Sequence, residues 1–260
     1  MPEIEILLGG YTFNADQTRM GLSTVALIRG QTLTVVDVAH FGRRNMLVDE
    51  LQNRGISLDA VGRVVLTHAH WDHSQNTDLF PNAEIVIHAK ELDYTRNPRP
   101  GDYATAHYFA ETLKGQKVRE ITGETRLEPG VTLIETPGHT RGHISVLVET
   151  AGGMVCIGGD AVSDAGAVGR GTPALIFWSE DEARASVQKV LAATNVVYPG
   201  HDRPFIISAS GEIQYLTDTP TIKFTGILDY DGSTFSIDVA LAPNRGTTVH
   251  PDARSLVAAG

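Results

Sequence analysis

The sequence Thr67-His68-Ala69-His70-Trp71-Asp72-His73 places four side chains that can bind a metal ion within six positions. It directly follows Val64-Val65-Leu66, an apolar run that predicts a short buried strand. Imidazole nitrogen and carboxylate oxygen suit zinc, and also iron or manganese. Side chains alternate along an extended strand end, so His68 and His70 point the same way and can share one ion. The last two residues of the motif follow a turn of the backbone, so we expect them to face a second ion.

Three later stretches end an apolar strand in a similar way, with glycine beside a side chain that can bind metal. They are Pro137-Gly138-His139, Gly158-Gly159-Asp160 and Pro199-Gly200-His201. Glycine permits tight turns and a close approach of the backbone. Four strand ends that deliver ligands to one edge indicate a single, convergent metal site.

The composition favours a globular protein with a small substrate. Hydrophobic residues make up 42% of the 260 residues and charged residues 20%, close to the average for soluble proteins. The formal net charge is −10, from 21 basic and 31 acidic residues. Because a protein that grips a nucleic-acid backbone usually needs a basic face, we expect no nucleic-acid partner. An uncharged or weakly charged small molecule is the expected substrate.

The sequence also carries cues about the compartment. Cys156 is the single cysteine, which excludes an intrachain disulfide and a cysteine-based zinc knot. The first residues lack the pattern of a signal peptide, and no run approaches the roughly 18 apolar residues of a membrane span. A cytoplasmic protein without a membrane partner is therefore expected, and a homodimer is left open.

The remaining patterns predict strands with helices interspersed, which favours sheet-on-sheet packing with helices outside. Helices are predicted at 46–54, 103–113 and 180–193, the last opened by a Ser-x-x-Glu capping box at Ser179. Strands are predicted at 4–8, 23–28, 32–38, 64–66, 85–87, 117–121, 131–135, 144–149, 154–157 and 196–198.

Two parts of the chain depart from this pattern of strands with helices interspersed. Residues 208–260 are predicted to be a strand-rich C-terminal extension, packed on a domain formed by residues 1–207. Within the extension, strands at 221–228 and 234–241 are predicted to form a hairpin. Residues 96–116 are turn-rich, and two interpretations remain open: a surface excursion over an aromatic cluster, or a lid or wall of the substrate pocket.

The H-x-H-x-D-H motif at 68–73, followed by His139, Asp160 and His201, resembles the metallo-β-lactamase superfamily in both order and spacing. The resemblance covers residues from about 20 to 205. It implies an α/β fold, an αββα sandwich in which two mixed β-sheets pack face to face with helices outside. The site would then lie at one edge of the sandwich, between the sheets.

The resemblance also implies a role for each ligand. His68, His70 and His139 would hold one metal ion; Asp72, His73 and His201 would hold the other; and Asp160 would bridge the two. Asp37 would orient a ligand imidazole from outside the coordination sphere. The implied cofactors are two divalent ions, with zinc favoured over manganese or iron.

The mechanism expected from this resemblance is hydrolysis. A hydroxide that bridges the two ions would attack a carbonyl, Asp160 would hold the bridge, and Asp72 would accept or relay the proton. The residue at 160 is aspartate rather than cysteine, which argues against the lactam-cleaving branch that uses a cysteine ligand there. Residue 70 is histidine rather than glutamate, which argues against the flavodiiron branch.

The stretch from Pro137 to Ser145 is similar to that of lactonases and glyoxalase-II-like thioesterases, in which only the first histidine binds metal. His143 is therefore interpreted as structural. A lactone is the favoured substrate, although the run 160–164 lacks the tyrosine that acyl-homoserine lactonases carry shortly after the bridging aspartate. Two alternatives remain: a phosphodiesterase or nuclease, and a mononuclear iron enzyme like the persulfide dioxygenases.

Candidate substrate contacts come from the irregular segments near the expected site. They are the aromatic, imidazole and guanidinium side chains Tyr103, His107, Arg170, Phe177 and Trp178. Packing within the protein is the competing interpretation, above all for the last two.

Overall fold

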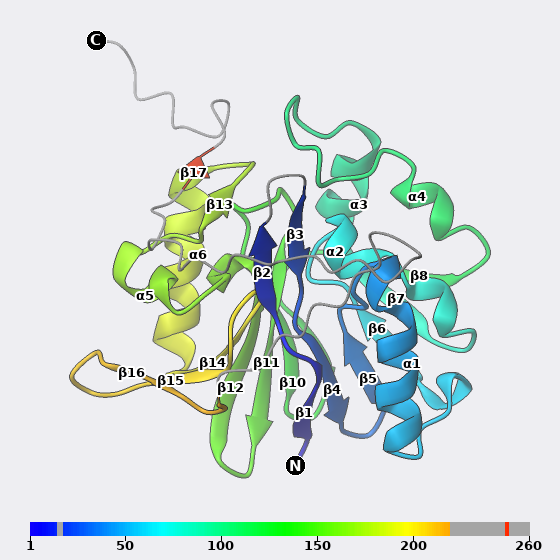
Figure 1. The fold of residues 1–260 in the computed structure, drawn as a ribbon, viewed down its shortest axis with the longest axis horizontal. Helices are drawn as coiled ribbons and strands as arrows, with labels where there is room; N and C mark the ends of the chain where they lie inside the picture. The colour runs from blue at the N-terminus through cyan, green and yellow to red at the C-terminus, as the bar shows by residue number, and fades with distance from the viewer. Residues whose placement is uncertain (15–17, 219–247, 250–260) are drawn as a thin grey trace, which may run out of the picture.

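The structure is a computed structural model that describes residues 1–14, 18–218 and 248–249. Two β-sheets face each other, and helices cover their outer sides (Figure 1). Within the described residues, the helices are all too short or too polar to cross a membrane.

The first sheet has six strands in the order β1-β4-β5-β6-β7-β8. Strands β4 and β5, which correspond to the strands predicted at 23–28 and 32–38, form an antiparallel hairpin, whereas β5, β6, β7 and β8 run parallel to one another. The sheet is therefore mixed. The strand bounds are Glu3–Leu8 for β1, Val25–Arg29 for β4, Leu33–Val36 for β5, Arg63–Val65 for β6, Glu84–His88 for β7 and Lys117–Ile121 for β8.

The second sheet has seven strands in the order β16-β15-β14-β12-β11-β10-β9, and it is also mixed because β12 and β14 are parallel. Parallel neighbours end at the same edge of a sheet, so β12 and β14 deliver the residues that follow them to one place. The strand bounds are Thr125–Glu128 for β9, Val131–Glu135 for β10, Ile144–Thr150 for β11, Gly153–Gly159 for β12, Val196–Pro199 for β14, Phe205–Ile207 for β15 and Ile213–Tyr215 for β16.

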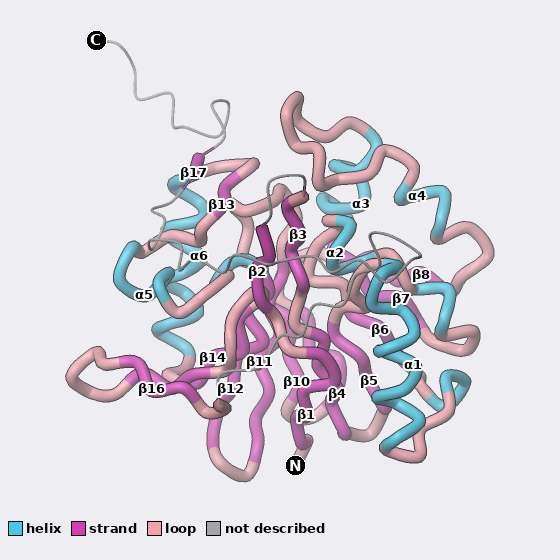
Figure 2. The backbone as a smooth tube through the Cα atoms, viewed as in Figure 1, coloured by secondary structure: helices cyan, strands magenta, loops and turns pink. Residues whose placement is uncertain are grey.

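Two small sheets lie outside this sandwich (Figure 2). The hairpin β2–β3, with bounds Tyr11–Asn14 and Arg19–Leu22, follows β1 along the chain. Strand β13 (Leu175–Ile176) pairs in parallel with β17 (Thr248–Val249).

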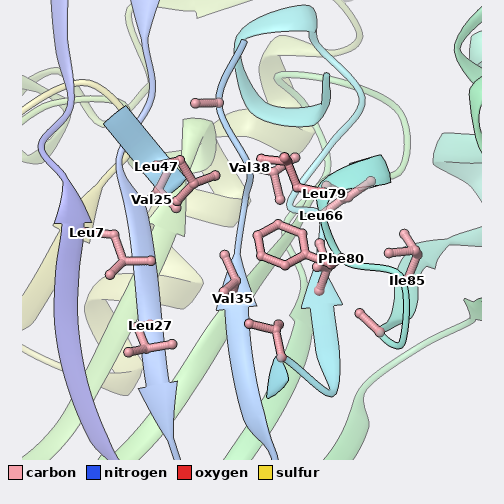
Figure 3. Close-up of a cluster of buried hydrophobic side chains, with 14 of the residues drawn as sticks. Leu7, Val25, Leu27, Val35, Val38, Leu47, Leu66, Leu79, Phe80 and Ile85 are labelled. Carbon is pink, nitrogen blue, oxygen red and sulfur yellow. The ribbon is translucent and has the colours of Figure 1, made fainter. Parts of the chain in front are cut away.

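Three layers of core side chains hold the sandwich together. Alternate residues of both sheets meet between them, among them Ile28, Val65 and Val146, all buried. On the outer side of the six-stranded sheet, side chains from β1, β4, β5 and α1 form a second cluster (Figure 3). Helix α1 contributes Leu47 and Leu51 to it, and burying each side chain stabilises the fold by about 1.5–3 kcal/mol.

The helices divide between the two outer faces. Helix α6 packs on the seven-stranded sheet through Val190, in a third cluster with Cys156 and Val197. It begins as predicted, because the Ser179 hydroxyl accepts a hydrogen bond from the N–H of Glu182. The helix bounds are Arg44–Asn53 for α1, Trp71–Ser74 for α2, Ala89–Arg96 for α3, Phe109–Thr112 for α4, Gly166–Arg170 for α5 and Glu180–Ala193 for α6.

The predicted helix at 103–113 is wrong over most of its length, since only the α4 turn forms there. Backbone groups ahead of α4 bond elsewhere: the Ala104 carbonyl accepts from the N–H of Trp71, and the Asp102 carboxylate accepts from the N–H groups of Ala104 and Thr105. Helix α3, in contrast, was not predicted from the sequence.

The C-terminal extension is described only in part. Its strand β16 pairs with β15 and so extends the seven-stranded sheet. The predicted hairpin at 221–228 and 234–241 lies outside the described residues.

Candidate metal centre

Four strand ends bring the predicted ligands to one edge of the sandwich. His68 and His70 lie between the end of β6 and α2, and α2 itself carries Asp72 and His73. The other three ligands follow β10, β12 and β14; they are His139, Asp160 and His201. All seven belong to groups of three side chains whose ligand atoms lie within 4.8 Å of one another.

The first group consists of three histidines. His70 Nδ1 lies 3.0 Å from His139 Nε2, and the His68 ring centroid lies 4.6 Å from that of His70 and 4.8 Å from that of His139. Among the described residues, His68 Nε2 is a buried nitrogen without a hydrogen-bond partner. Three imidazole nitrogens thus converge on one point.

The second group is richer in carboxylate. His201 Nε2 lies 3.3 Å from both His73 Nε2 and Asp72 Oδ2. Asp160 lies between the groups: its Oδ2 is 3.4 Å from His139 Nε2 and 3.2 Å from His201 Nε2, and its Oδ1 is 3.4 Å from His73 Nε2. Its carboxylate therefore contacts ligands of both groups, as a bridge requires.

The nitrogen of each imidazole that faces away from the cluster is bonded to the surrounding protein. These contacts join His68 Nδ1 to Thr67 Oγ1, His70 Nε2 to the Asp102 carboxylate, His73 Nδ1 to Asp37 Oδ2, His139 Nδ1 to the Leu175 carbonyl and His201 Nδ1 to the Leu22 carbonyl. Carbonyl and carboxylate oxygens only accept, and the Thr67 hydroxyl donates its own proton to Asp37 Oδ2, so it too accepts from the imidazole. The outward nitrogen therefore carries the proton and the inward nitrogen presents a lone pair.

Lone pairs facing each other at 3.0–3.3 Å repel unless positive charge lies between them. This applies to the pair His70–His139 and to the pair His73–His201. A proton shared between the two nitrogens of a pair would relieve the repulsion in that pair. It would still leave His68 Nε2 and Asp160 Oδ1 without a hydrogen-bond partner. With metal–nitrogen bonds of about 2.0–2.1 Å, two ligands of a tetrahedral ion lie about 3.3 Å apart. The residues present therefore fit two metal cations.

The electrostatics differ between the two halves. Burial lowers the pKa of His139 to about 4 and holds the pKa of His68 well below its usual value, so both rings are neutral, as metal ligands must be. The third histidine of this half, His70, differs: burial opposes its charge, but Asp102 outweighs burial and raises its pKa. In the other half, burial also opposes the charge of His73, but Asp72 and Asp37 outweigh it and raise the pKa of His73 well above its usual value. This half therefore attracts positive charge.

Two glycines leave room for carboxylate ligands. A Cβ at Gly21, on β3, would lie 2.2 Å from Asp72 Oδ2, and a Cβ at Gly200 would lie 2.0 Å from Asp160 Oδ1. The close approach expected of glycine beside a ligand is thus present at Gly200. The approach of β3 to Asp72 carries no signal in the sequence.

Two buried side chains brace the loops that carry the ligands. His143 Nε2 accepts hydrogen bonds from the N–H groups of Asp160 and Ala161, so this histidine has the structural contacts expected of it. Glu91, on α3, accepts from the N–H of Ala69 and the N–H of Gly142, and thereby ties two ligand loops together. The role of Glu91 was missed because Glu91 lies 22 positions after Ala69 and 51 positions before Gly142, and no local sequence pattern connects residues so far apart.

A comparison with protein families supports the interpretation of this geometry. Residues 18–201 match the model of the metallo-β-lactamase superfamily. This chain belongs to that superfamily. The resemblance inferred from the H-x-H-x-D-H motif is thereby confirmed, and so is the αββα sandwich.

Relatives within the superfamily include proteins with named activities. Metallo-β-lactamase domain-containing protein 1 of Xenopus laevis is 32% identical over 209 residues, which cover 79% of each protein. An N-acyl homoserine lactonase of a Bacillus species is 28% identical over 131 residues, which cover 50% of this chain and 48% of the lactonase. The solved structure of AidC, a dizinc quorum-quenching lactonase, superposes with a TM-score of 0.60 at 18% identity, over 79% of this chain and 82% of that chain. At that identity the likeness shows the fold alone.

The candidate substrate contacts lie in different surroundings in this metallo-β-lactamase fold. The Phe177 ring packs edge-on against His70 and His139, with centroid distances of 5.1 and 5.5 Å. Trp178 lies under the Arg99 guanidinium, 4.2 Å from the ring centroid. Arg170 instead binds the Asp164 carboxylate.

Tyr103 and His107 lie on the segment ahead of α4, and both are exposed, Tyr103 to 93%. Among the candidates, the side chain of Phe177 contacts ligand residues of the candidate metal centre.

Proposed function

We propose that this protein is a dinuclear metal-dependent hydrolase that cleaves a small-molecule ester, with a lactone as the favoured substrate. One observation carries the proposal. In each of the pairs His70–His139 and His73–His201, two imidazole nitrogens point their lone pairs at each other, and Asp160 lies between the two pairs. Two cations satisfy this arrangement, and zinc is favoured for a site of nitrogen and carboxylate ligands.

The ligands divide into two sets. His68, His70 and His139 would hold one ion, and Asp72, His73 and His201 the other, with Asp160 shared between them. When bound, such ions supply Lewis acidity toward a carbonyl oxygen and lower the pKa of water toward neutrality.

The side chains of the protein then have separate tasks. Asp72 accepts the proton that an attacking water releases, because its carboxylate lies at the cluster and is 8% exposed. Phe177 covers the imidazoles of His70 and His139 with an apolar ring and so excludes water from that side. Asp160 keeps the two ligand groups next to each other, because its carboxylate contacts both.

The preference for a lactone rests on two supports. Relatives of this chain include an N-acyl homoserine lactonase. The net charge of −10 disfavours a polyanionic substrate such as a nucleic acid.

A substrate panel tests the proposal. Lactones, thioesters, β-lactams and phosphodiesters are offered to the zinc-, manganese- and iron-loaded protein, and turnover of a lactone by the dinuclear form is expected. Asp160→Ala should abolish this turnover, whereas Asp59→Asn, which changes an exposed carboxylate on the turn Leu58–Ala60, should leave it unchanged.

Other outcomes of the panel would assign a different reaction. Cleavage of phosphodiesters alone would indicate the phosphodiesterase alternative. One iron per chain with oxygen-dependent turnover of a persulfide would indicate the mononuclear alternative. Either result contradicts the proposed ester hydrolase.

A further inference from the structure

A second buried carboxylate, Asp102, contacts a ligand of the candidate metal centre. Its two oxygens lie 3.3 and 3.4 Å from Nε2 of His70, the nitrogen that faces away from the cluster. Asp102 lies between α3 and α4, in the segment that the sequence left open as a surface excursion or a lid. The side chain of Asp102 is completely buried, so this contact is shielded from water.

The carboxylate of Asp102 is held in place from several sides. Its Oδ1 accepts hydrogen bonds from the N–H groups of Ala104 and Thr105, each at 3.1 Å. Its Oδ2 accepts from the hydroxyls of Tyr94 at 2.7 Å and Thr105 at 2.8 Å. A carboxylate with four such donors cannot swing away from the imidazole without breaking them.

The backbone of the same segment is attached to the metal-binding motif. The N–H of Trp71 donates to the Ala104 carbonyl at 3.0 Å, and His70 forms an isolated antiparallel bridge with Thr105. Residues 102–105 are therefore docked directly on the backbone of a ligand, which favours a fixed brace over a lid that opens.

The contact matches one at the other half of the centre. There the Asp37 carboxylate lies 2.7 Å from Nδ1 of His73. Each half thus has one imidazole backed by a buried carboxylate. Such a partner fixes the tautomer and orientation of the ring and makes the metal-facing nitrogen more basic.

We propose that Asp102 is a positioning residue that aims Nδ1 of His70 at the first metal ion and raises the affinity of that half for its cation. The proposal rests on the dinuclear centre proposed above. It assigns residues 102–105 to the metal centre, because the carboxylate, its donors and the docked backbone form one unit.

The test is the substitution Asp102→Asn in the full chain, measured by zinc competition with a chelator and by the visible absorption of the cobalt-loaded protein. Asparagine keeps the shape but turns an NH₂ group toward donors that include His70 Nε2. The affinity of one zinc site should fall by about 10- to 100-fold, with a changed cobalt spectrum, and the other site should change far less.

The matched control is Asp93→Asn, on α3, whose carboxylate is 61% exposed and pairs with Arg141. It should leave both affinities and the cobalt spectrum unchanged. A merely structural role of Asp102 would lower the melting temperature without a change in the cobalt spectrum or a loss confined to one site.

Nuclear magnetic resonance of the zinc-loaded wild-type protein tests the same contact without a substitution, should Asp102→Asn fail to fold. His70 should be the ligand histidine whose Nε2 carries a proton that exchanges slowly with water. A His70 protonated at Nδ1, or an Nε2 proton in rapid exchange, would overturn the inference.

The outcomes separate the two proposals. If the wild type binds two zinc ions and Asp102→Asn binds them with the same affinities and cobalt spectrum, the role of Asp102 is overturned and the proposed hydrolase stands. If the wild type binds fewer than two ions, both are overturned.

Discussion

Asp37 Oδ2 lies 2.7 Å from His73 Nδ1, although Asp37 takes a left-handed backbone conformation with φ of 58°. For a residue other than glycine, such a conformation costs on the order of 1–3 kcal/mol. It is held by the hydrogen bond from the Asp37 N–H to the Val65 carbonyl and by the bond that Asp37 Oδ1 accepts from the N–H of Thr67. The strained residue therefore links β5 to the metal-binding motif.

Asp37→Asn should weaken zinc binding at the half of the centre that contains His73, by about 10- to 100-fold. Asparagine tolerates the left-handed conformation, so the backbone is kept, but its NH₂ group replaces an oxygen that accepts from Thr67 or His73. Chelator competition measures the affinity, with Asp59→Asn as the exposed control. Unchanged zinc affinity in Asp37→Asn would contradict the orienting role.

Gly21→Ala should lower metal affinity and turnover while the protein still folds. The added Cβ would lie 2.2 Å from Asp72 Oδ2 and 3.0 Å from His201 Cε1, so β3 or the ligands must shift. Gly9→Ala is the matched control, because a Cβ there meets nothing within 4 Å. Metal titration and circular dichroism of both variants check the expectation, and equal metal binding in both would refute it.

Glu5→Gln removes the ion pair with Arg29 and should lower the free energy of unfolding at neutral pH by up to about 1 kcal/mol. The loss is this small because the pair is partly exposed and screened by solvent. The hydrogen bond to Arg29 lowers the pKa of Glu5 below its ordinary value of 4.5, burial opposes the shift, and Arg54 adds to it. A lowered carboxyl pKa contributes stability above the ordinary value and loses it as the pH falls below that value.

Urea unfolding of wild type and Glu5→Gln over a series of pH values measures this contribution. The difference in unfolding free energy should be largest near neutral pH and should vanish in acid. Glu3→Gln, an exposed position on the same strand, is the control. A difference that is constant with pH would show that charge is not its cause.

Cys156 should not react with thiol reagents in the native protein. Its side chain is fully buried in the cluster under α6, and burial raises the pKa of the thiol to about 12. Since the thiolate is the reactive species, labelling should begin only when the chain unfolds. Titration with a chromogenic disulfide, with and without denaturant, checks this, and rapid labelling of the folded protein would contradict the buried position.

Much of the candidate site could be predicted from the sequence because each ligand follows an apolar strand. Asp160 directly follows β12, His139 and His201 come a few positions after β10 and β14, and the spacing within 68–73 is local. Such features depend on neighbouring residues, so a single sequence displays them. The hairpin β4–β5 was predictable for the same reason.

The supporting residues could not be predicted in this way. Asp102 is 32 positions from His70, and Glu91 is 51 positions from Gly142, so only the folded chain brings them together. The predicted helix at 103–113 failed for a related reason. The backbone around Ala104 forms its hydrogen bonds with Trp71 and Asp102, and these tertiary contacts replace the bonds of a helix.

The central claim, a centre with two metal ions, is tested most directly by the zinc stoichiometry of the purified chain after equilibrium loading and removal of loosely bound metal. The facing pairs His70–His139 and His73–His201, with Asp160 between them, predict two zinc ions per chain, and fewer than two in Asp160→Ala. A wild-type protein that retains no zinc, or a single ion, would contradict the account.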